Sequence, residues 1–411
     1  MTADDRALPR SFRWLLAAES ASSVGTYVTL LALQTIVVVT LGGTSADTGL
    51  LSAARWLPYL VAGLLVGAVV DRMRRRPIMV WSDAARAVLL AAIPVLWLLD
   101  ALTLPALLVV VVAYGVTTVV NDAASMAFLP RLVAGPALQR AHARIDTADA
   151  IAQSGGPALG GLVVRAVGAP FAVLVDALAS AFAAVAVARI RIDEPAPPAG
   201  GRRVRDVVRD VAEGMRLVYR GTALTRLALA THVWFGANAV LGVLVAPFAL
   251  TRLGLDPGAF GLVLTAAGVG AVVGASVTGA VGRRLGALPT VAACHALSAV
   301  AVVVMGLAAL AAEDALAAAL VLGAGQLLHG IAMGASNSHE MAYRQTRTPD
   351  AAQARVNMTM RAANRAVIVV VAPIAGLVAV TTGIVPMLVA AAALFAVAAV
   401  AIAAAPRASG T

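Results

Sequence analysis

Apolar segments of about 20 residues or more follow one another along almost the whole chain, and short polar stretches separate them. A helix needs about 20 apolar residues to cross the hydrocarbon core of a bilayer. The pattern therefore predicts an all-α integral membrane protein with twelve transmembrane helices. Their expected ranges are 12–41, 48–70, 78–98, 104–129, 143–166, 169–190, 223–250, 259–281, 287–311, 315–342, 355–380 and 384–404.

One polar stretch is longer than the others. It begins with a Pro- and Gly-rich segment from Arg191 to Gly201 and continues as a basic segment to Arg220. Apolar residues recur at helical spacing in the basic segment, which predicts an amphipathic helix on the anionic inner leaflet. A solvated linker helix packed under the protein is the alternative. The expected organisation is an N-terminal six-helix bundle at 1–190, a cytoplasmic linker at 191–222 and a C-terminal six-helix bundle at 223–411.

Composition and charge also favour a membrane protein. Hydrophobic residues make up 61% of the chain and charged residues 13%, whereas soluble proteins have about 25% charged residues. The net charge of +10 does not indicate a nucleic-acid partner, because the 31 basic residues, all arginine, lie mostly between the apolar segments. With a cytoplasmic N-terminus, 26 of them lie on the cytoplasmic side and only Arg165 and Arg252 lie outside. We therefore expect a multi-pass protein of the inner cell membrane with both termini in the cytoplasm.

A charged motif, Gly67-Ala-Val-Val-Asp71-Arg72-Met-Arg74-Arg75-Arg76, follows the second predicted helix. Gly67 lets another helix approach closely, and Asp71 can lie against the positive N-terminal end of a helix. Arg72, Arg75 and Arg76 can bind acidic groups or lipid phosphates, so the segment can act as a cytoplasmic gate. The motif resembles the signature after helix 2 of the major facilitator superfamily. A charge cluster that only orients the helices is the alternative.

The fifth predicted helix contains a second motif, which includes Gly156, Pro157, Gly160 and Gly161. Pro157 removes a backbone hydrogen bond and kinks the helix, and the glycines allow a neighbouring helix to pack closely. The motif resembles the one associated with antiporters of the same superfamily, with Ala152 in place of its first glycine. A glycine-rich packing face with no bearing on transport direction is the alternative.

Shorter matches extend the resemblance over nearly the whole chain, at 54–59, 83–86, 128–133 and 175–178. Together they resemble the exporter branch that contains enterobactin exporters and macrolide efflux proteins. The resemblance implies the major facilitator fold, with two six-helix bundles and a central cavity lined by helices 1, 4, 7 and 10. It also implies a transporter that works as a single chain.

Three ionisable residues share one depth in the cytoplasmic third of the bilayer when residues are counted from the helix ends: Glu19, Arg86 and Asp122. A charged group at helix-centre depth costs at least about 2.5–3.5 kcal/mol on insertion scales, which suggests a function. Since partial desolvation favours the protonated form of a carboxyl group, we expect Glu19 and Asp122 to take up and release protons. A static ion pair between Arg86 and either carboxylate is the alternative.

Other polar residues are candidates for the walls of the cavity. Glu19, Ser22, Ser23 and Thr26 fall at i, i+3, i+4 and i+7 and form one polar stripe on the first helix. Tyr27 can contribute to a pocket for an apolar substrate, although helix packing is the alternative. The superfamily resemblance implies that the opposite wall contains His232, Asn238, His329 and Asn337. Arg55 and Asp176 are expected at similar depth in the outer third, where they can form a structural pair.

Other classes of protein require residue patterns that the sequence lacks. It has no nucleotide-binding Gly-Lys-Ser/Thr loop, no metal-ligand spacing and no clustered nucleophile and base. We therefore expect no catalytic residues and no metal or cofactor, with the proton gradient as the energy source. The expected function is proton-coupled export of a small amphipathic compound such as a drug, antibiotic or siderophore-like metabolite. An importer or facilitator of a polar nutrient is the alternative, and a membrane-embedded sensor or enzyme is a remote one. The expected partners are this small molecule, protons and lipid, with no nucleic acid.

Overall fold

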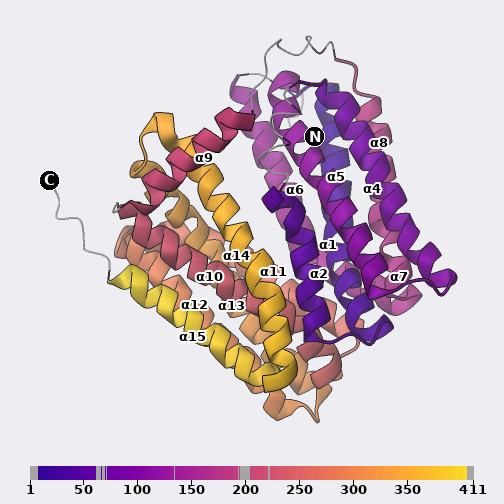
Figure 1. The fold of residues 1–411 in the computed structure, drawn as a ribbon, viewed down its shortest axis with the longest axis vertical. Helices are drawn as coiled ribbons and strands as arrows, with labels where there is room; N and C mark the ends of the chain where they lie inside the picture. The colour runs from indigo at the N-terminus through magenta and orange to yellow at the C-terminus, as the bar shows by residue number, and fades with distance from the viewer. Residues whose placement is uncertain are drawn as a thin grey trace. The chain divides into compact units, whose positions relative to one another are not determined.

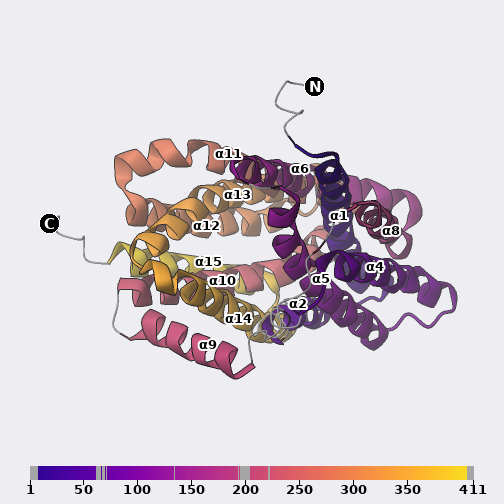
Figure 2. The same cartoon turned by 90° about the horizontal axis from the view of Figure 1, so that it is seen from above.

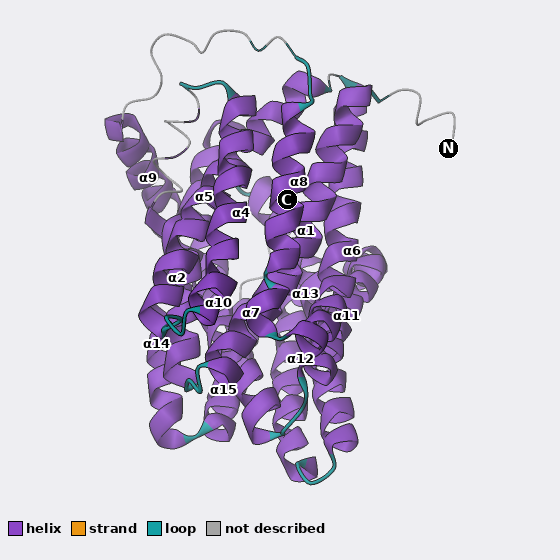
Figure 3. Ribbon diagram, turned by 90° about the vertical axis from the view of Figure 1, so that its right-hand side faces the viewer, coloured by secondary structure: helices purple, strands orange, loops and turns teal. Residues whose placement is uncertain are grey.

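The structure is a computed structural model of the chain and describes residues 8–61, 66, 70, 72–133, 135–192, 194, 204–220 and 223–404. All regular secondary structure in these ranges is helical (Figure 3). Ten helices in the described part are long and apolar enough to cross a bilayer. The prediction of an all-α membrane fold is therefore confirmed. The other two predicted spans correspond to α2 and α6.

The helices belong to two compact units. Unit 1 comprises Met1–Leu41 and Ala54–Val207, and unit 2 comprises Gly42–Ala53 and Val208–Thr411. The first half of α2 (Ser45–Val61) therefore belongs to unit 2 and its second half to unit 1.

In unit 1, α1 packs against α6 and α8, while α4 packs against α5 and α8 (Figure 1). An apolar cluster that includes Phe12, Met79, Phe128 and Val187 joins α1, α4, α5 and α8. This cluster fixes the helices that surround the pocket described below. The bounds in this unit are α1 Arg10–Thr35, η2 Ile36–Thr40, α4 Arg75–Leu98, α5 Leu104–Leu132, α6 Pro136–Val167, α7 Ala169–Ala172 and α8 Leu174–Ala188.

In unit 2, α13 packs against α11 and α12, and α15 packs against α10 and α12 (Figure 2). The α11–α13 contact is close because Gly270 and Gly274 face the backbone of α13, while Gly330 and Gly334 face the backbone of α11. The bounds in this unit are α10 Ala223–Pro247, η3 Phe248–Arg252, α11 Pro257–Leu285, α12 Ala287–Leu307, η4 Ala308–Ala311, α13 Ala315–Thr346, η5 Asp350–Ala352, α14 Gln353–Thr382 and α15 Ile384–Ala403.

The linker contains the helix expected from its apolar spacing, α9 (Val204–Tyr219). Its C-terminal half packs against α14, because Gly214 faces the backbone of Arg355 and the side chain of Thr359. Val218 is buried in a cluster with Val356 and Met360. One face of α9 is therefore covered by protein. Contact of the helix with lipid stays a prediction.

The two helices that differ most from the sequence prediction are α2 and α6. The described part of α2 ends at Val61, before the end of the predicted span at 48–70. Helix α6 begins well before residue 143, because Gly135 has a φ of 62° and Pro136 opens the helix. Its first half carries Arg140, Arg144, Asp146 and Asp149, and its second half contains Gln153, Ser154, Arg165 and several glycines, so α6 is less apolar than the ten membrane-length helices.

Candidate functional site

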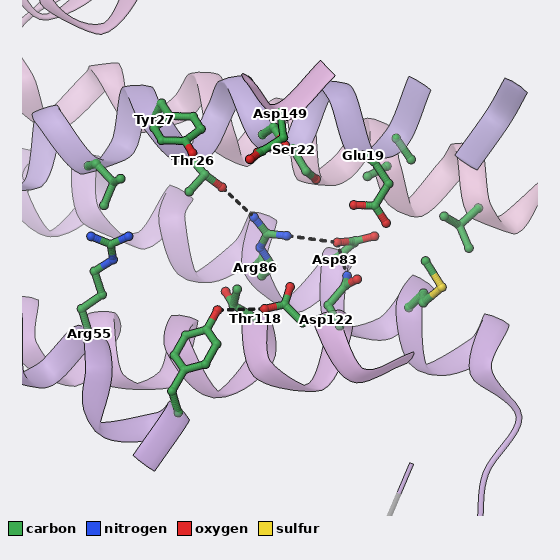
Figure 4. Close-up of a pocket in the computed structure, with 18 residues that line it drawn as sticks. Glu19, Ser22, Thr26, Tyr27, Arg55, Asp83, Arg86, Thr118, Asp122 and Asp149 are labelled. Atoms are coloured by element: carbon green, nitrogen blue, oxygen red, sulfur yellow. Dashed lines mark hydrogen bonds and ion pairs between the residues drawn. The ribbon is translucent and has the colours of Figure 1, made fainter. Parts of the chain in front are cut away.

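Unit 1 contains a pocket of about 220 Å³ whose wall is formed by α1, α2, α4, α5, α6 and α8 (Figure 4). Most side chains in the wall are polar, although the surrounding helices are mainly apolar. The polar residues of the wall are Glu19, Ser22, Ser23, Thr26, Tyr27, Arg55, Tyr59, Asp83, Arg86, Thr118, Asn121, Asp122 and Asp149.

The polar stripe on α1 faces this pocket along its whole length (Figure 4). Glu19 is partly buried and accepts a hydrogen bond of 2.5 Å from the Ser125 hydroxyl on α5. Ser23 donates to Asp149 on α6 at 2.9 Å. Neither Ser125 nor Asp149 was among the residues predicted from the sequence. The signal for Asp149 was present, because it is an acidic residue inside a predicted membrane helix.

Asp122 also lies in the pocket wall, on α5. It accepts a hydrogen bond of 2.9 Å from the Tyr59 hydroxyl on α2. Tyr27 lies on α1, and the Gln153 side chain donates to its hydroxyl at 3.2 Å. The structure therefore places Glu19, Asp122, Ser23, Thr26 and Tyr27 around one pocket. Their roles in proton coupling and substrate binding stay predictions.

A buried ion cluster lies beside the pocket. The Arg86 guanidinium is 3.5 Å from Asp83 through Nη1 and 3.5 Å from Asp176 through Nη2. The exposed fractions are 5% for Arg86, 3% for Asp83 and 0% for Asp176. The Tyr114 hydroxyl donates to Asp176 at 3.0 Å, and the Asn121 side chain donates to Asp83 at 2.5 Å. Arg86 and Asp83 line the pocket, whereas Asp176 does not.

This cluster corrects the expected ion pairs. Asp176 pairs with Arg86 and not with Arg55, whose guanidinium lies 5.3 Å from the centre of the Trp56 ring. Likewise, the carboxylates beside Arg86 are Asp83 and Asp176, whereas Glu19 bonds to Ser125. The depth estimate started the third helix at residue 78, but α4 begins at Arg75. Arg86 therefore lies at the middle of its helix, within reach of a residue assigned to the outer third.

The basic residues at the start of α4 bind an acidic residue of the linker. The backbone N–H groups of Arg75 and Arg76 each donate to the Glu194 carboxylate at 2.7 Å. A carboxylate in this position satisfies free N–H groups and the positive end of the helix dipole. Gly67 and Asp71 of the predicted gate lie outside the described residues, and Arg72 is exposed. The gating role of the motif stays a prediction.

The glycines on α6 hold it close to α1. A side chain added at Gly156 would meet Tyr27 Cβ at 2.5 Å, and one added at Gly160 would meet Val28 Cα at 3.1 Å. Pro157 and Gly161 are also buried. The motif therefore positions Tyr27 and the rest of the α1 stripe in the pocket wall, whatever its bearing on transport direction.

Three of the candidate residues of unit 2, His232, Asn238 and His329, form side-chain hydrogen bonds. The His232 ring bonds to Asn364 at 2.7 Å and to the Tyr219 hydroxyl at 2.5 Å. His329 bonds to the Asn238 side-chain oxygen at 3.1 Å. Asn337 is exposed on α13. Hydrogen bonds of this kind are typical of histidines packed between helices.

The described part of the chain is all-α, with ten membrane-length apolar helices, two compact units and a polar pocket in unit 1. This arrangement is typical of membrane transporters of the major facilitator type. Solved structures agree on the fold. The chain is similar to the nucleoside transporter NupG, with a TM-score of 0.78, 13% identity, and coverage of 97% of this chain and 100% of the other. It is also similar to a bacterial homologue of the iron transporter ferroportin, with a TM-score of 0.73, 16% identity, and coverage of 96% and 99%.

The sequence model of the transmembrane secretion effector family matches residues 8–408, so the chain belongs to this family. The resemblance to the major facilitator superfamily is thereby confirmed. Among curated proteins, the multidrug efflux pump Tap of Mycolicibacterium fortuitum is 27% identical over 266 residues, which are 64% of each chain. Tap of Mycobacterium tuberculosis (strain ATCC 25618 / H37Rv) is 27% identical over 195 residues, 46% of each chain. The match thus spans less than two thirds of the length of these relatives.

Proposed function

We propose that the chain is a secondary active transporter of the inner cell membrane that exports a small amphipathic compound in exchange for protons. The proton gradient is its energy source, it needs no bound cofactor, and it works as a single chain with both termini in the cytoplasm. Family membership and the similarity to the multidrug efflux pump Tap support export. The arginine distribution supports the orientation.

The observation that carries the proposal is the partner of Glu19. Its carboxyl group bonds to the Ser125 hydroxyl, and not to an arginine. A hydroxyl can donate to an ionised carboxylate and can accept from a protonated carboxyl, so it accommodates both states. An arginine can only donate and therefore favours the ionised state. Glu19 is thus suited to gain and lose a proton without losing its hydrogen bond.

The pocket also fits an amphipathic substrate. Leu30, Met79 and Val187 provide apolar surface in its wall, and Tyr27 and Tyr59 provide aromatic rings that end in hydroxyl groups. Aromatic residues of this kind combine a large apolar contact with one polar group. A drug, antibiotic or siderophore-like metabolite with both apolar and polar parts matches this lining.

The test uses inside-out vesicles with an acidic interior and a fluorescent pH-gradient dye. Macrolides, cationic dyes, siderophores and aromatic drugs are added one at a time. A substrate releases protons from vesicles that contain the wild-type chain, and Glu19→Gln or Asp122→Asn removes this release. Asp100→Asn is the matched control, because Asp100 is an exposed residue after α4 and its φ of 53° suits asparagine.

Two outcomes would contradict the proposal. If Glu19→Gln and Asp122→Asn both keep full proton release, these carboxyl groups do not carry the protons. If no compound releases protons while radiolabelled sugars or amino acids equilibrate, the chain is a facilitator of polar nutrients and not an exporter.

A further inference from the structure

The ion cluster around Arg86 has an uneven charge. Asp83 and Asp176 are both carboxylates when ionised, and the Arg86 guanidinium is their one ion-pair partner among the described residues. The three buried groups then carry a net charge of −1. A buried net charge is unfavourable because protein interior solvates it poorly, and uptake of a single proton removes it.

The hydrogen bonds distinguish the two carboxyl groups. Asp176 accepts from Arg86 and Ser180 at Oδ1 and from Tyr114 at Oδ2, so both of its oxygens are occupied. Asp83 accepts from Asn121 and Arg86 at the same atom, Oδ1. A proton on Asp176 would displace a donor. A proton on Asp83 Oδ2 would leave both bonds at Oδ1 in place.

Access to water also differs between them. Asp83 lines the pocket (Figure 4), whereas Asp176 is not part of the pocket wall and is fully buried against Arg86. A proton in pocket water can therefore reach Asp83 directly. Arg86 on its own helix α4 is the ion-pair partner of Asp83, and Arg86 also contacts Asp176 on α8. The other charged groups that share the pocket wall with Asp83 are Glu19 on α1, Arg55 on α2, Asp122 on α5 and Asp149 on α6.

We propose that Asp83 is a further proton-carrying residue of this transporter, which takes up a proton at Oδ2 from the pocket and releases it there. This proposal rests on the proposed proton-coupled function. When Asp83 is protonated, Arg86 keeps its hydrogen bond to Asp83 Oδ1 but has Asp176 as its one ionised partner in the cluster. When the proton leaves, the two carboxylates share the charge of Arg86 again. Arg86 Nη2 also lies 3.5 Å from Thr26 on the α1 stripe. Arg86 thus connects the charge of Asp83 to the wall that would contact substrate.

The test measures protonation directly and needs no substrate. The purified full-length chain is titrated from pH 9 to pH 5, and infrared difference spectra are recorded in the carbonyl region, where protonated carboxyl groups absorb and carboxylates do not. Most exposed carboxylates stay ionised above about pH 5. Because Glu19 and Asp122 contribute bands of their own when they take up protons, the readout is the difference between variants. We expect Asp83→Asn to lack one protonated-carboxyl band that both the wild-type chain and Asp100→Asn show.

Two further variants make the result specific. Asp83→Glu should move the band to another frequency without removing it, and this variant decides the question if Asp83→Asn does not fold. In Asp176→Asn, Asp83 and Arg86 balance each other in charge, so no net negative charge is left for a proton to neutralise. We therefore expect Asp176→Asn to lose the Asp83 band as well. The double variant with both Asp83→Asn and Asp176→Asn should therefore lack the same band as Asp83→Asn and no further band.

The proposal is overturned if Asp83→Asn keeps the wild-type bands or if Asp83→Glu leaves every band at its wild-type frequency. Either result would show that Asp83 keeps the same protonation state between pH 9 and pH 5. Because the spectra are independent of transport, failure of the vesicle assay for Glu19 and Asp122 does not affect them. Conversely, proton-coupled export by those two residues remains possible if Asp83 does not titrate.

Discussion

Unit 1 and unit 2 share helical architecture but bury different polar groups. In both halves of the sequence a long helix ends in a π-helix, η2 or η3, followed by Leu and then by a glycine with positive φ, Gly42 or Gly254. Among the described residues, the buried Asp and Arg residues nevertheless all lie in unit 1: Arg75, Asp83, Arg86 and Asp176. Unit 2 buries uncharged hydroxyl and amide groups and histidines, including Thr231, His295, Gln326, His329 and Asn364.

The difference indicates that the repeated fold does not imply repeated chemistry. Buried charges are costly unless they are paired, whereas hydrogen-bonded neutral groups are much less so. Unit 1 contains Arg86 between two carboxylates next to a pocket, while unit 2 contains the His329–Asn238 bond. We therefore expect proton coupling to depend on unit 1, and variants in unit 2 to leave it intact.

The largest expected effect comes from Arg86→Met. This variant leaves Asp83 and Asp176 buried without their cation, and removal of one partner of a buried ion pair costs about 3–5 kcal/mol. We expect a strongly lowered unfolding temperature of the purified chain in detergent. A second-site change, Asp83→Asn, should restore part of the stability because it removes one of the two like charges. Equal stability of Arg86→Met and wild type would show that the cluster is not a stabilising ion pair.

The next effect concerns the glycine junctions. Gly156→Val places a side chain against Tyr27, whereas Gly155→Val has open space around it. Overpacking costs about 1–3 kcal/mol. Both positions lie inside α6, so the effect of valine on the helix backbone itself is the same in the two variants. We expect Gly156→Val to unfold at a lower temperature than Gly155→Val.

Unit 2 offers the same comparison on α13. Gly330→Val would meet the backbone of α11, whereas Gly323→Val meets nothing within 4 Å. If the two valine variants of a pair unfold at the same temperature, the close approach of the neighbouring helix is not the reason for glycine at position 156 or 330.

The sequence predicted most of the fold because each membrane helix must bury an apolar segment of fixed length. It also predicted the α1 stripe, since helical spacing alone places Glu19 and Thr26 on one face. It did not predict the Arg86–Asp176 pair, because contacts between helices depend on where each helix begins. It did not predict that Asp149 meets the α1 stripe, although Asp149 lies inside the predicted fifth helix, because the contact between Asp149 and Ser23 depends on how α1 and α6 pack.

A smaller effect is expected from Asn238→Ala in unit 2. The variant removes the hydrogen bond to His329, which is worth about 1 kcal/mol in a partly buried position. The number of protons released per substrate should stay at the wild-type value, because neither residue of this bond is one of the proposed proton-carrying carboxyl groups. Loss of proton release in Asn238→Ala, with the chain still folded, would show that unit 2 takes part in coupling.

The smallest effect is expected at the ion pair between Glu213 on α9 and Arg355 on α14. Both side chains are partly exposed, 47% and 31%, and a solvent-exposed pair contributes about 0.2–1 kcal/mol. Glu213→Gln should therefore lower the unfolding temperature only slightly, and the difference should shrink in high salt. Gly214→Val, one residue further, should have the larger effect because its side chain would meet the backbone of Arg355. Should Glu213→Gln prove the more damaging of the two, charge and not packing would hold α9 on unit 2.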